Sequence, residues 1–293
     1  MTPAVSVIVP TRHRSHLVGR AVESILNQTF ADFEIVLVDN NPPPSRLSCR
    51  PKLSPWLSHH RLHLYESDRI RNPAMARNLG LEAARGKWVT YLDDDDEYRQ
   101  EKLDRQLAAA ERTGLPLGVC GVLHHLPGRR RLRHWDAEEI RGDDLLLNFF
   151  GTPCMFHQRV PGIRFDEELD AGEDVHYFHQ LIDYFDLDRV FNVSDALVDV
   201  YQQPRGHVNL NACAVWRAHK TILRQFGSRY SERAAAVFHT RARLRYCTME
   251  PGHGVEMLRI CAGLARLHGL AERRLILNCL LWQIPWLRHW LIH

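Results

Sequence analysis

An apolar run leads directly into four consecutive aspartates in Trp88-Val89-Thr90-Tyr91-Leu92-Asp93-Asp94-Asp95-Asp96. The apolar part is typical of a strand buried in a sheet, so the aspartates follow the end of that strand. Adjacent carboxylates repel one another unless a positive group is held among them. Their hard oxygen ligands suit Mg²⁺ or Mn²⁺, which commonly bridges the phosphates of a nucleotide. A solvated acidic turn is the alternative interpretation of such a run in isolation.

Upstream of the aspartates, short apolar runs alternate with amphipathic stretches. Strands are predicted at residues 5–9, 35–38, 62–65 and 88–92, and helices at residues 17–26 and 74–84. Ser15 is the expected N-cap of the first helix. Such alternation predicts βαβ units with right-handed crossovers. The expected fold class is therefore α/β, with a Rossmann-like, mainly parallel sheet flanked by helices.

Polar residues follow three of these predicted strands. Pro10-Thr11 comes after the first strand, Asp39 after the second, and the aspartate run after the fourth. In open α/β sheets, ligands bind beyond the carboxyl ends of the strands. The three segments are therefore expected to meet at one edge of the sheet and to form a binding site there.

The chain beyond Tyr98 has a mixed pattern. We predict a helix at residues 103–112, a strand at 117–122, a basic turn at 128–133 and a helix at 138–150. Gly172-Glu173-Asp174 opens another helical stretch, and helices predominate from Val215 onward.

The composition narrows the class of protein. A chain of 293 residues with 45% hydrophobic and 25% charged residues is typical of a globular protein with one large or two small domains. A formal charge of +3 gives no indication of a nucleic-acid partner. The 7 cysteines form no CxxC pair, which argues against a zinc ribbon or a disulfide framework and fits a reducing cytosol. We find no signal peptide and no apolar stretch of spanning length, so we expect a cytoplasmic protein.

The order and spacing of these segments resemble the nucleotide-sugar glycosyltransferases of family 2, which have the GT-A fold. The resemblance is carried by Val5-Ser6-Val7-Ile8-Val9-Pro10-Thr11, Ala21-Val22-Glu23-Ser24-Ile25-Leu26-Asn27-Gln28-Thr29, Phe33-Glu34-Ile35-Val36-Leu37-Val38-Asp39-Asn40, Ala76-Arg77-Asn78-Leu79-Gly80 and Gly86 to Asp96. A further patch lies at residues 170–181. The resemblance implies a nucleotide-sugar-binding part at residues 1–98, an acceptor-binding part at 99–212 and a helical C-terminal extension at 213–293.

The resemblance also implies which residues bind the donor. Pro10 and Thr11 would lie at the base and ribose, and Asp39 would accept a hydrogen bond from uracil if the donor is a uridine nucleotide. The remaining donor-binding candidates are Arg12, Arg71, Asn72, Arg77, Asp93 and Asp94. Asp39 as a turn cap and Arg77 as a surface ion pair are the simpler alternatives.

The implied metal and catalytic residues are acidic. Asp93-Asp94-Asp95 resembles the DXD motif of the family, with Asp95 as the main ligand of Mn²⁺ or Mg²⁺ and Asp93 beside it. Glu173-Asp174 resembles the acidic pair that supplies the catalytic base, and Asp174 is the first choice over Glu173. An acidic pair also suits a helix N-terminus for electrostatic reasons alone. His207 is a further candidate metal ligand, although Pro204 occupies the place where the family pattern has its histidine.

Two other stretches could contact a partner or a membrane. Arg129, Arg130, Arg131 and Arg133 form a basic run, which is either a solvated turn or a contact for an anionic acceptor or membrane surface. The C-terminal stretch at residues 275–292 carries Trp282, Trp286 and Trp290 at four-residue spacing. Core packing or a homodimer interface is one interpretation of that stretch, and a helix lying peripherally on a membrane is the other.

The leading hypothesis is a metal-dependent, inverting glycosyltransferase that uses a nucleotide sugar, with a UDP-sugar expected, and Asp174 as general base. A nucleotidyltransferase is an alternative, although the first strand lacks the glycine-rich phosphate loop of such enzymes. A non-catalytic module that binds a sugar or nucleotide is another. The acceptor stays open among a glycan, a lipid-linked glycan, a peptide and a small natural product.

Overall fold

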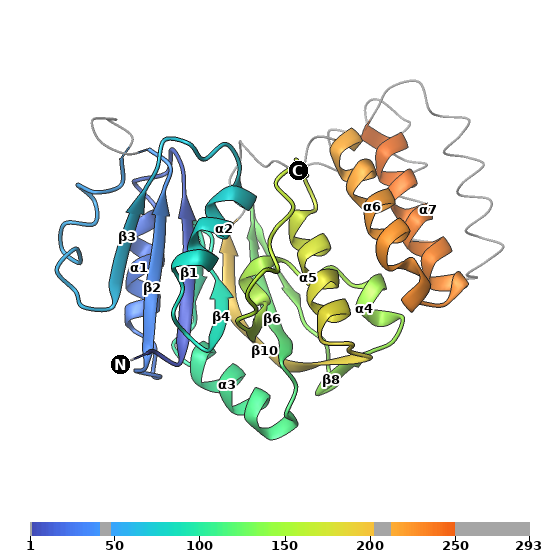
Figure 1. The fold of residues 1–293 in the computed structure, drawn as a ribbon, viewed down its shortest axis with the longest axis horizontal. Coiled ribbons are helices and arrows are strands. Elements are labelled where there is room, and N and C mark those ends of the chain that lie inside the picture. The colour runs from blue at the N-terminus through green and yellow to red at the C-terminus, as the bar shows by residue number, and fades with distance from the viewer. Residues whose placement is uncertain (1, 42–47, 202–211, 250–293) are drawn as a thin grey trace. The chain divides into compact units, whose positions relative to one another are not determined.

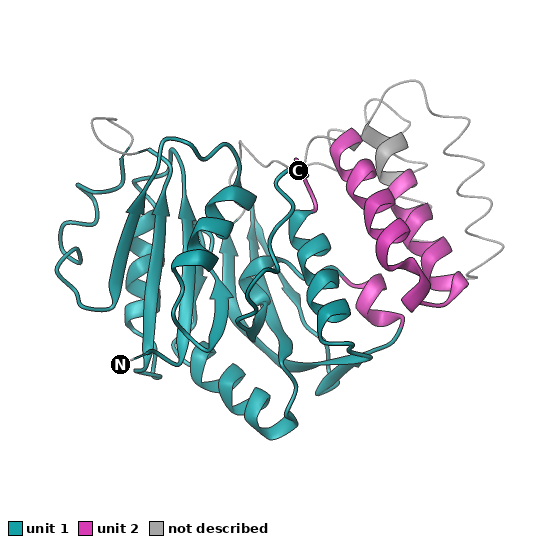
Figure 2. Cartoon of the chain, in the orientation of Figure 1, with its two compact units in different colours: residues 1–142, 149–168, 173–204 teal, residues 143–148, 169–172, 205–293 magenta. Residues whose placement is uncertain are grey.

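The computed structural model describes residues 2–41, 48–201 and 212–249. The chain divides into two compact units (Figure 2). The larger, unit 1, comprises residues 1–142, 149–168 and 173–204, and unit 2 comprises residues 143–148, 169–172 and 205–293. No helix within the described ranges is both long and apolar enough to cross a membrane.

A single mixed sheet forms the centre of unit 1 (Figure 1). Its strands are β1 (Val5–Thr11), β2 (Phe33–Asp39), β3 (Leu62–Glu66), β4 (Trp88–Tyr91), β5 (Glu97–Tyr98), β6 (Leu117–Leu126), β7 (Arg129–Arg133), β8 (Glu139–Arg141), β9 (Phe156–Gln158) and β10 (Arg189–Tyr201). Their order is β3-β2-β1-β4-β9-β6-β10-β5, with β7 paired to β6 and β8 paired to β10.

The strand directions place most carboxyl ends at one edge of the sheet. β3, β2, β1 and β4 are mutually parallel. β9 is antiparallel to both β4 and β6, so β6 runs in the same direction as β4. β10 is parallel to β6. The expected α/β class with a mainly parallel, Rossmann-like sheet is confirmed, and β9 is the antiparallel strand that joins its two halves.

Helices flank the sheet in unit 1 and make up unit 2. Unit 1 contains α1 (Val18–Leu26), α2 (Pro73–Ala83), α3 (Lys102–Thr113), the short η1 (Thr152–Cys154) and α5 (Glu173–Tyr184). Unit 2 contains α4 (Asp144–Leu147), α6 (Ala212–Phe226), η3 (Gly227–Arg229) and α7 (Glu232–Met249). Of these, α6 and α7 agree with the helical C-terminal part expected from the sequence.

Local signals explain where the helices of the site begin. Asn72 caps α2 because its side-chain oxygen accepts a hydrogen bond from the backbone N–H of Met75 at 2.9 Å, and Pro73 occupies the first turn. The prediction that Ser15 caps α1 is wrong, since the N-cap is Leu17, which makes no side-chain capping bond. The buried apolar face of α1, with Val18, Ala21, Val22 and Ile25, stabilises this helix instead.

Two predicted elements in the middle of the chain are also wrong. Of the turn predicted at residues 128–133, only Gly128 lies in a turn, because Arg129–Arg133 pair with β6 as strand β7. Residues 138–150 are not one helix, because Gly142 has a φ of +52°, which ends β8 before the four-residue α4 begins.

Candidate active site

Three strand ends meet at the carboxyl edge of the sheet, as the sequence predicts. Thr11 and Asp39 are paired in register at the ends of β1 and β2. The Thr11 hydroxyl donates a hydrogen bond of 2.7 Å to Asp94 Oδ2, which follows β4. Thr11 therefore links the segment of Asp39 to the aspartate loop.

The aspartate loop is largely buried and is held by two arginines. Asp94, Asp95 and Asp96 are each no more than 5% exposed. Arg14 Nη1 lies 2.7 Å from Asp95 Oδ2 and 3.3 Å from Asp94 Oδ1, and Arg20 Nη2 donates to the Asp95 carbonyl at 2.6 Å. A solvated acidic turn is thereby ruled out as the description of this loop.

Negative charge is in excess within the loop. Burial, together with Asp95 and Asp93, raises the pKa of Asp94 to about 7, despite opposing contributions from Thr11 and Arg14. Burial and the charges of Asp93 and Asp95 raise the pKa of Asp96 well above its usual range. A cation at this position would lower both pKa values.

This donor set fits Mg²⁺ or Mn²⁺ bound together with a nucleotide. Such ions are commonly held by one or two carboxylates, with phosphate oxygens and waters completing the shell. Among the described residues, no three His, Cys, Asp or Glu side chains are grouped as a complete metal cage. The aspartate loop therefore suits a cation that a diphosphate helps to coordinate.

Arg77 joins the aspartate loop to the acidic pair of α5. Its Nη2 donates to Asp93 Oδ1 and its Nη1 to Glu173 Oε1, each at 2.9 Å. Arg77 is buried, and although burial opposes its charge, Asp93, Glu173 and Asp174 raise its pKa. The two acidic motifs of the sequence, 80 positions apart at Asp93 and Glu173, thus share one guanidinium.

Asp174 lies at the N-terminal turn of α5 and is half-buried. Its Oδ1 accepts a hydrogen bond of 2.8 Å from the Val175 N–H. Burial and the neighbouring Glu173 raise the pKa of Asp174 to about 7, although Arg77 acts in the opposite direction. A carboxyl with this pKa can both accept and release a proton near neutral pH.

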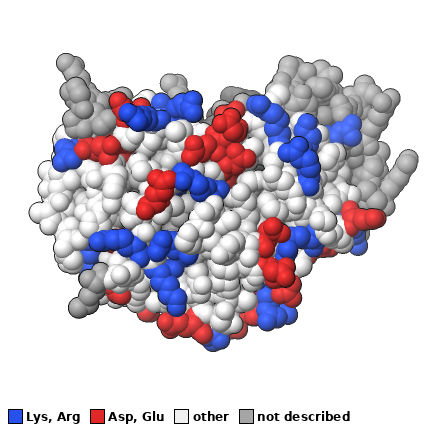
Figure 3. All heavy atoms as spheres, in the orientation of Figure 1, with Lys and Arg blue, Asp and Glu red and all other residues white. Residues whose placement is uncertain are grey.

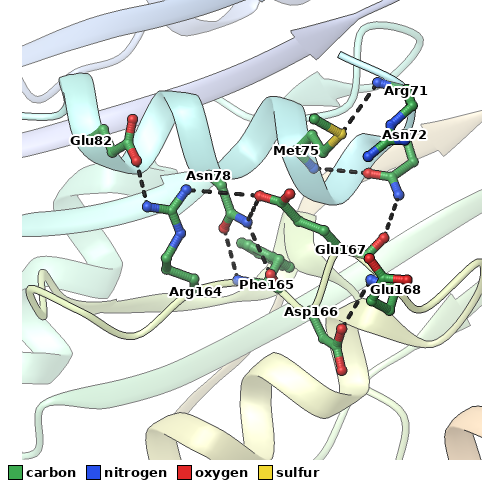
Figure 4. Close-up of polar contacts among 10 residues, drawn as sticks. All are labelled: Arg71, Asn72, Met75, Asn78, Glu82, Arg164, Phe165, Asp166, Glu167 and Glu168. Carbon is green, nitrogen blue, oxygen red and sulfur yellow. Dashed lines mark hydrogen bonds and ion pairs between the residues drawn. The ribbon is translucent and has the colours of Figure 1, made fainter. Parts of the chain in front are cut away.

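Two other predicted donor residues, Arg71 and Asn72, lie at the N-terminus of α2 (Figure 4). Arg12 Nη1 donates to the Arg71 carbonyl at 2.9 Å, which brings the segments after β1 and before α2 together. Asn72 Nδ2 donates to the Glu167 carbonyl at 2.8 Å. Asn78 holds the same loop through Phe165 and Glu167, so α2 positions the chain that leads to the acidic pair.

Asp39 is fully buried, and its carboxylate accepts hydrogen bonds from two backbone N–H groups that follow it in the chain. Its Oδ1 accepts from the Asn41 N–H at 2.8 Å, and its Oδ2 accepts from the Cys49 N–H at 2.8 Å. Both oxygens are therefore engaged by the chain itself. Pro10 is opposite Val38 in the β1–β2 register, one residue before the Thr11–Asp39 pair.

Arg14 and Arg20 contact the aspartate loop, and neither was predicted from the sequence. Arg14 belongs to the basic segment Arg12-His13-Arg14 after the first strand, which does not by itself indicate an aspartate partner. Arg20 carried no local signal, because its acceptor lies 75 positions away. On the face of the molecule seen in Figure 3, acidic and basic side chains lie next to one another.

Some predicted residues lie outside the described ranges. These are His207 and the loop around Pro204, and the tryptophan-rich stretch at residues 275–292. The last described residue before that loop, Tyr201, donates its N–H to Asp96 Oδ1 at 3.0 Å. β10 thus ends against the aspartate loop.

Comparisons with known proteins show which family this chain resembles in sequence. Residues 6–162 match the family described as glycosyl transferase family 2. The chain is 32% identical over 190 residues to the succinoglycan biosynthesis protein ExoO of Rhizobium meliloti, covering 59% of this chain and 53% of that protein. It is 39% identical over 179 residues to the GalNAc(5)-diNAcBac-PP-undecaprenol beta-1,3-glucosyltransferase of Campylobacter jejuni, covering 58% of this chain and 57% of that protein. The chain spans about half the length of these two curated relatives.

Solved structures share the fold. S. aureus TarS 1-349 in complex with UDP-GlcNAc superposes with a TM-score of 0.66 at 20% identity, covering 94% of this chain and 79% of that one. The mannosyltransferase PcManGT from Pyrobaculum calidifontis, in complex with GDP-Man and Mn²⁺, gives a TM-score of 0.60 at 16% identity, covering 99% and 83%. Both are GT-A transferases, which confirms the fold expected from the resemblance. The family match covers more than half of the chain, and the chain therefore belongs to glycosyl transferase family 2.

Proposed function

We propose that this chain transfers a sugar from a UDP-sugar to an acceptor hydroxyl with inversion at the anomeric carbon. Asp174 is the general base, and the reaction depends on Mn²⁺ or Mg²⁺. The observation that carries the proposal is the Arg77 bridge, which sets the acidic pair of α5 beside the aspartate loop. A donor diphosphate at the loop would then have a carboxylate within the same site.

The chemistry follows from the charges of these groups. The acceptor hydroxyl gives its proton to the Asp174 carboxylate as its oxygen attacks the anomeric carbon. The bond from that carbon to the diphosphate breaks, and the nucleoside diphosphate leaves with the electron pair. Attack opposite the leaving group inverts the configuration, so no covalent intermediate is needed.

A divalent cation held by Asp95 and Asp93 would neutralise charge on the departing diphosphate. Arg14 and Arg77 contribute fixed positive charge next to the same carboxylates. In the proposal, Thr11, Asp39, Arg12, Arg71 and Asn72 bind the nucleotide part of the donor. Residues 1–98 supply these groups, and residues 99–212 form the acceptor side.

The nature of the donor is the first point to test. One solved relative is in complex with UDP-GlcNAc and another with GDP-Man and Mn²⁺, so both nucleotides belong in the assay. Thermal denaturation is measured with UDP-glucose, UDP-GlcNAc, UDP-galactose and GDP-mannose, each with Mn²⁺ or with EDTA. A ligand at 100 times its Kd adds about 2.7 kcal/mol of stability, which is readily seen as a rise in Tm. We expect a rise with a UDP-sugar and Mn²⁺ but not with EDTA.

Two variants separate binding from catalysis. Asp95→Asn should abolish the Mn²⁺-dependent rise in Tm. Asp174→Asn should keep that rise but lose release of UDP in the presence of a mixture of acceptors. Release of pyrophosphate instead of UDP would identify a nucleotidyltransferase, and donor binding by the wild type without any turnover would identify a binding module.

A further inference from the structure

The basic run of the sequence forms one strand of a hairpin at the carboxyl edge of the sheet. β6 and β7 pair antiparallel from Val122–Arg133 to Leu126–Arg129. β6 runs in the same direction as β4, so the closed end of the hairpin lies at the edge where the aspartate loop lies. The hairpin also adjoins that loop through β10, because Tyr201 pairs with His125 and donates to Asp96.

The register sorts the arginines onto two faces. Residues opposite each other in an antiparallel pair point to the same side, and the sides alternate along a strand. Arg129, Arg131 and Arg133 therefore share one face with His124, whereas Arg130 shares the other face with His125. We call the set of Arg129, Arg131 and Arg133 the arginine row. Its members are spaced about 7 Å apart along the strand.

Aromatic contacts connect the arginine row to the helix that carries the proposed base. The Arg133 guanidinium lies 5.5 Å from the ring centre of Trp135 and 5.4 Å from that of Phe149. Trp135 packs on Phe150 at 4.8 Å, and Phe150 packs on Phe178 of α5 at 4.7 Å. The row thus belongs to the acceptor side of the proposed site.

Within the described part of the chain, no ion pair compensates the charge of the arginine row. Arg129 and Arg131 are exposed, Arg133 is half-buried, and no carboxylate of the described part of the chain is in ion-pair distance of any of the three. Burial and the charges of Arg133 and Arg131 lower the pKa of His124. Burial and Arg131 likewise lower the pKa of Arg133. These directions show a local excess of positive charge.

Protection of a sheet edge is the simpler explanation of charged residues on β7. That function would be served equally by residues on both faces of the strand. It does not explain three arginines on the face that connects to α5, nor the 44% exposed Phe149 ring beside them. Arginine, with its planar fork, is the side chain best suited to phosphate oxygens.

We propose that the arginine row binds phosphate groups of the acceptor, so that the acceptor of this transferase is a phosphate-bearing molecule. The inference rests on the proposed function, because it presupposes an acceptor side next to Asp174. The negative charges of a diphosphate or phosphodiester can pair with the three guanidinium groups. The bound phosphates would hold the acceptor while its hydroxyl meets the donor.

The test compares two variants with the same change of charge on one strand. Arg131→Gln removes a member of the row, and Arg130→Gln removes the arginine that points to the other face. Calorimetry measures binding of inorganic tripolyphosphate in EDTA, which removes any metal-dependent binding of phosphate at the donor site. Loss of one charge-assisted contact should weaken tripolyphosphate binding by about tenfold in Arg131→Gln and by less than about twofold in Arg130→Gln. The Tm of both variants should match that of the wild type.

Two results would overturn the proposal: an absence of tripolyphosphate binding, and an equal loss in both variants. If tripolyphosphate does not bind but phosphatidylglycerol vesicles do, the arginine row is a membrane-contact surface instead, with phosphatidylcholine vesicles as the neutral control. Donor binding with Mn²⁺ is measured on the same variants and should be unchanged. If the wild type fails to bind any nucleotide sugar while the difference between the variants persists, the proposed function fails and the phosphate site remains.

Discussion

The single guanidinium of Arg77 balances carboxylates from two distant segments, and its removal would leave them facing each other. In Arg77→Met, Asp93 and Glu173 lose their shared partner. Loss of one partner of a buried pair costs about 3–5 kcal/mol. We expect the lower end, about 3 kcal/mol, because the Asp93 side chain is 36% exposed and partly screened by solvent. Urea unfolding measures the loss.

Arg77→Lys is the matched control for that experiment. Lysine keeps the charge but lacks the fork that reaches two carboxylates in fixed directions. Its stability should lie between those of the wild type and Arg77→Met. If Arg77→Met is as stable as the wild type, the Arg77 bridge contributes nothing to the free energy of unfolding.

Asp174 makes the rate of transfer depend on pH in a defined direction. Its pKa is raised to about 7, so the carboxyl is protonated below that pH and cannot accept the acceptor proton. The rate should therefore rise with pH through about 7 and level off above it. Because Glu173 raises this pKa, Glu173→Gln should move the midpoint to lower pH while activity is retained. Complete loss of activity in Glu173→Gln, with activity kept in Asp174→Asn, would make Glu173 the base.

Local sequence predicted the acidic residues of the site but not their partners. The carboxyl-edge rule placed Thr11, Asp39 and the aspartate loop together, and the structure brings them together through Thr11 and Asp94. Arg14 and Arg20 could not be assigned, because an arginine after a strand has no local feature that reveals an acceptor 75 or more positions away. The hydrogen bond from the Cys49 N–H to Asp39 Oδ2 joins residues 10 positions apart, and no local pattern indicates it.

Helix α2 packs so closely on β1 that one of its residues must lack a side chain. A Cβ atom on Gly80 would lie 2.4 Å from Ile8 Cγ2, well inside van der Waals contact. In an exposed helix, Gly→Ala would stabilise by up to about 1 kcal/mol. Here overpacking costs about 1–3 kcal/mol and outweighs that gain, so Gly80→Ala should be destabilising in urea unfolding.

Gly19 of α1 provides the control for helix propensity. A Cβ atom there would lie 3.3 Å from the Trp56 side chain, which a small shift of the ring relieves. Gly19→Ala should therefore be close to neutral. If both variants gain stability, the contact of α2 with β1 is looser than the structure shows.

Elements with strong local patterns were predictable, and elements fixed by pairing were not. The buried runs of β1, β2 and β4 were predicted within a few residues because each is apolar and ends at a polar residue or proline. β7 reads as a basic turn because its exposed arginines have no strand-like apolar alternation. Only pairing with β6 across Pro127 and Gly128 makes it a strand. Residues 138–150 contain a helical repeat of apolar positions, but Gly142 and the pairing of β8 with β10 prevail over it.

The stability of unit 1 as a whole depends on histidines that must remain neutral. His157 is fully buried on β9, the strand that joins the two halves of the sheet. Its Nε2 lies 3.0 Å from the Tyr91 hydroxyl and 3.4 Å from that of Tyr177, and its Nδ1 lies 2.7 Å from the Gln158 carbonyl. Burial lowers the pKa of His157 to about 4. Burial and His176 lower the pKa of His179 to about 3.

A lowered histidine pKa destabilises the folded state as the solution becomes acidic. Below about pH 6.5 the unfolded chain binds a proton that the folded chain cannot bind until about pH 4. At pH 5 this difference amounts to about 2 kcal/mol for His157. The raised pKa values of Asp94 and Asp174 have the opposite effect, since these carboxyls bind protons more readily in the folded state. The pH dependence of the free energy of unfolding of the wild type alone therefore does not isolate the histidine contribution.

The comparison of His157→Phe with the wild type does isolate it. The variant should be less stable at pH 7.5, because it loses the hydrogen bonds of the ring. Between pH 7.5 and pH 5 it should lose about 2 kcal/mol less than the wild type does, in urea unfolding at each pH. His60→Gln, at an exposed position before β3, is the control, and its free energy of unfolding should depend on pH as that of the wild type does. If the free energy of unfolding depends on pH in the same way for His157→Phe and the wild type, protonation of His157 does not destabilise the sheet in acid. Another residue would then account for the loss, and β9 would join the two halves of the sheet whether or not the ring is neutral.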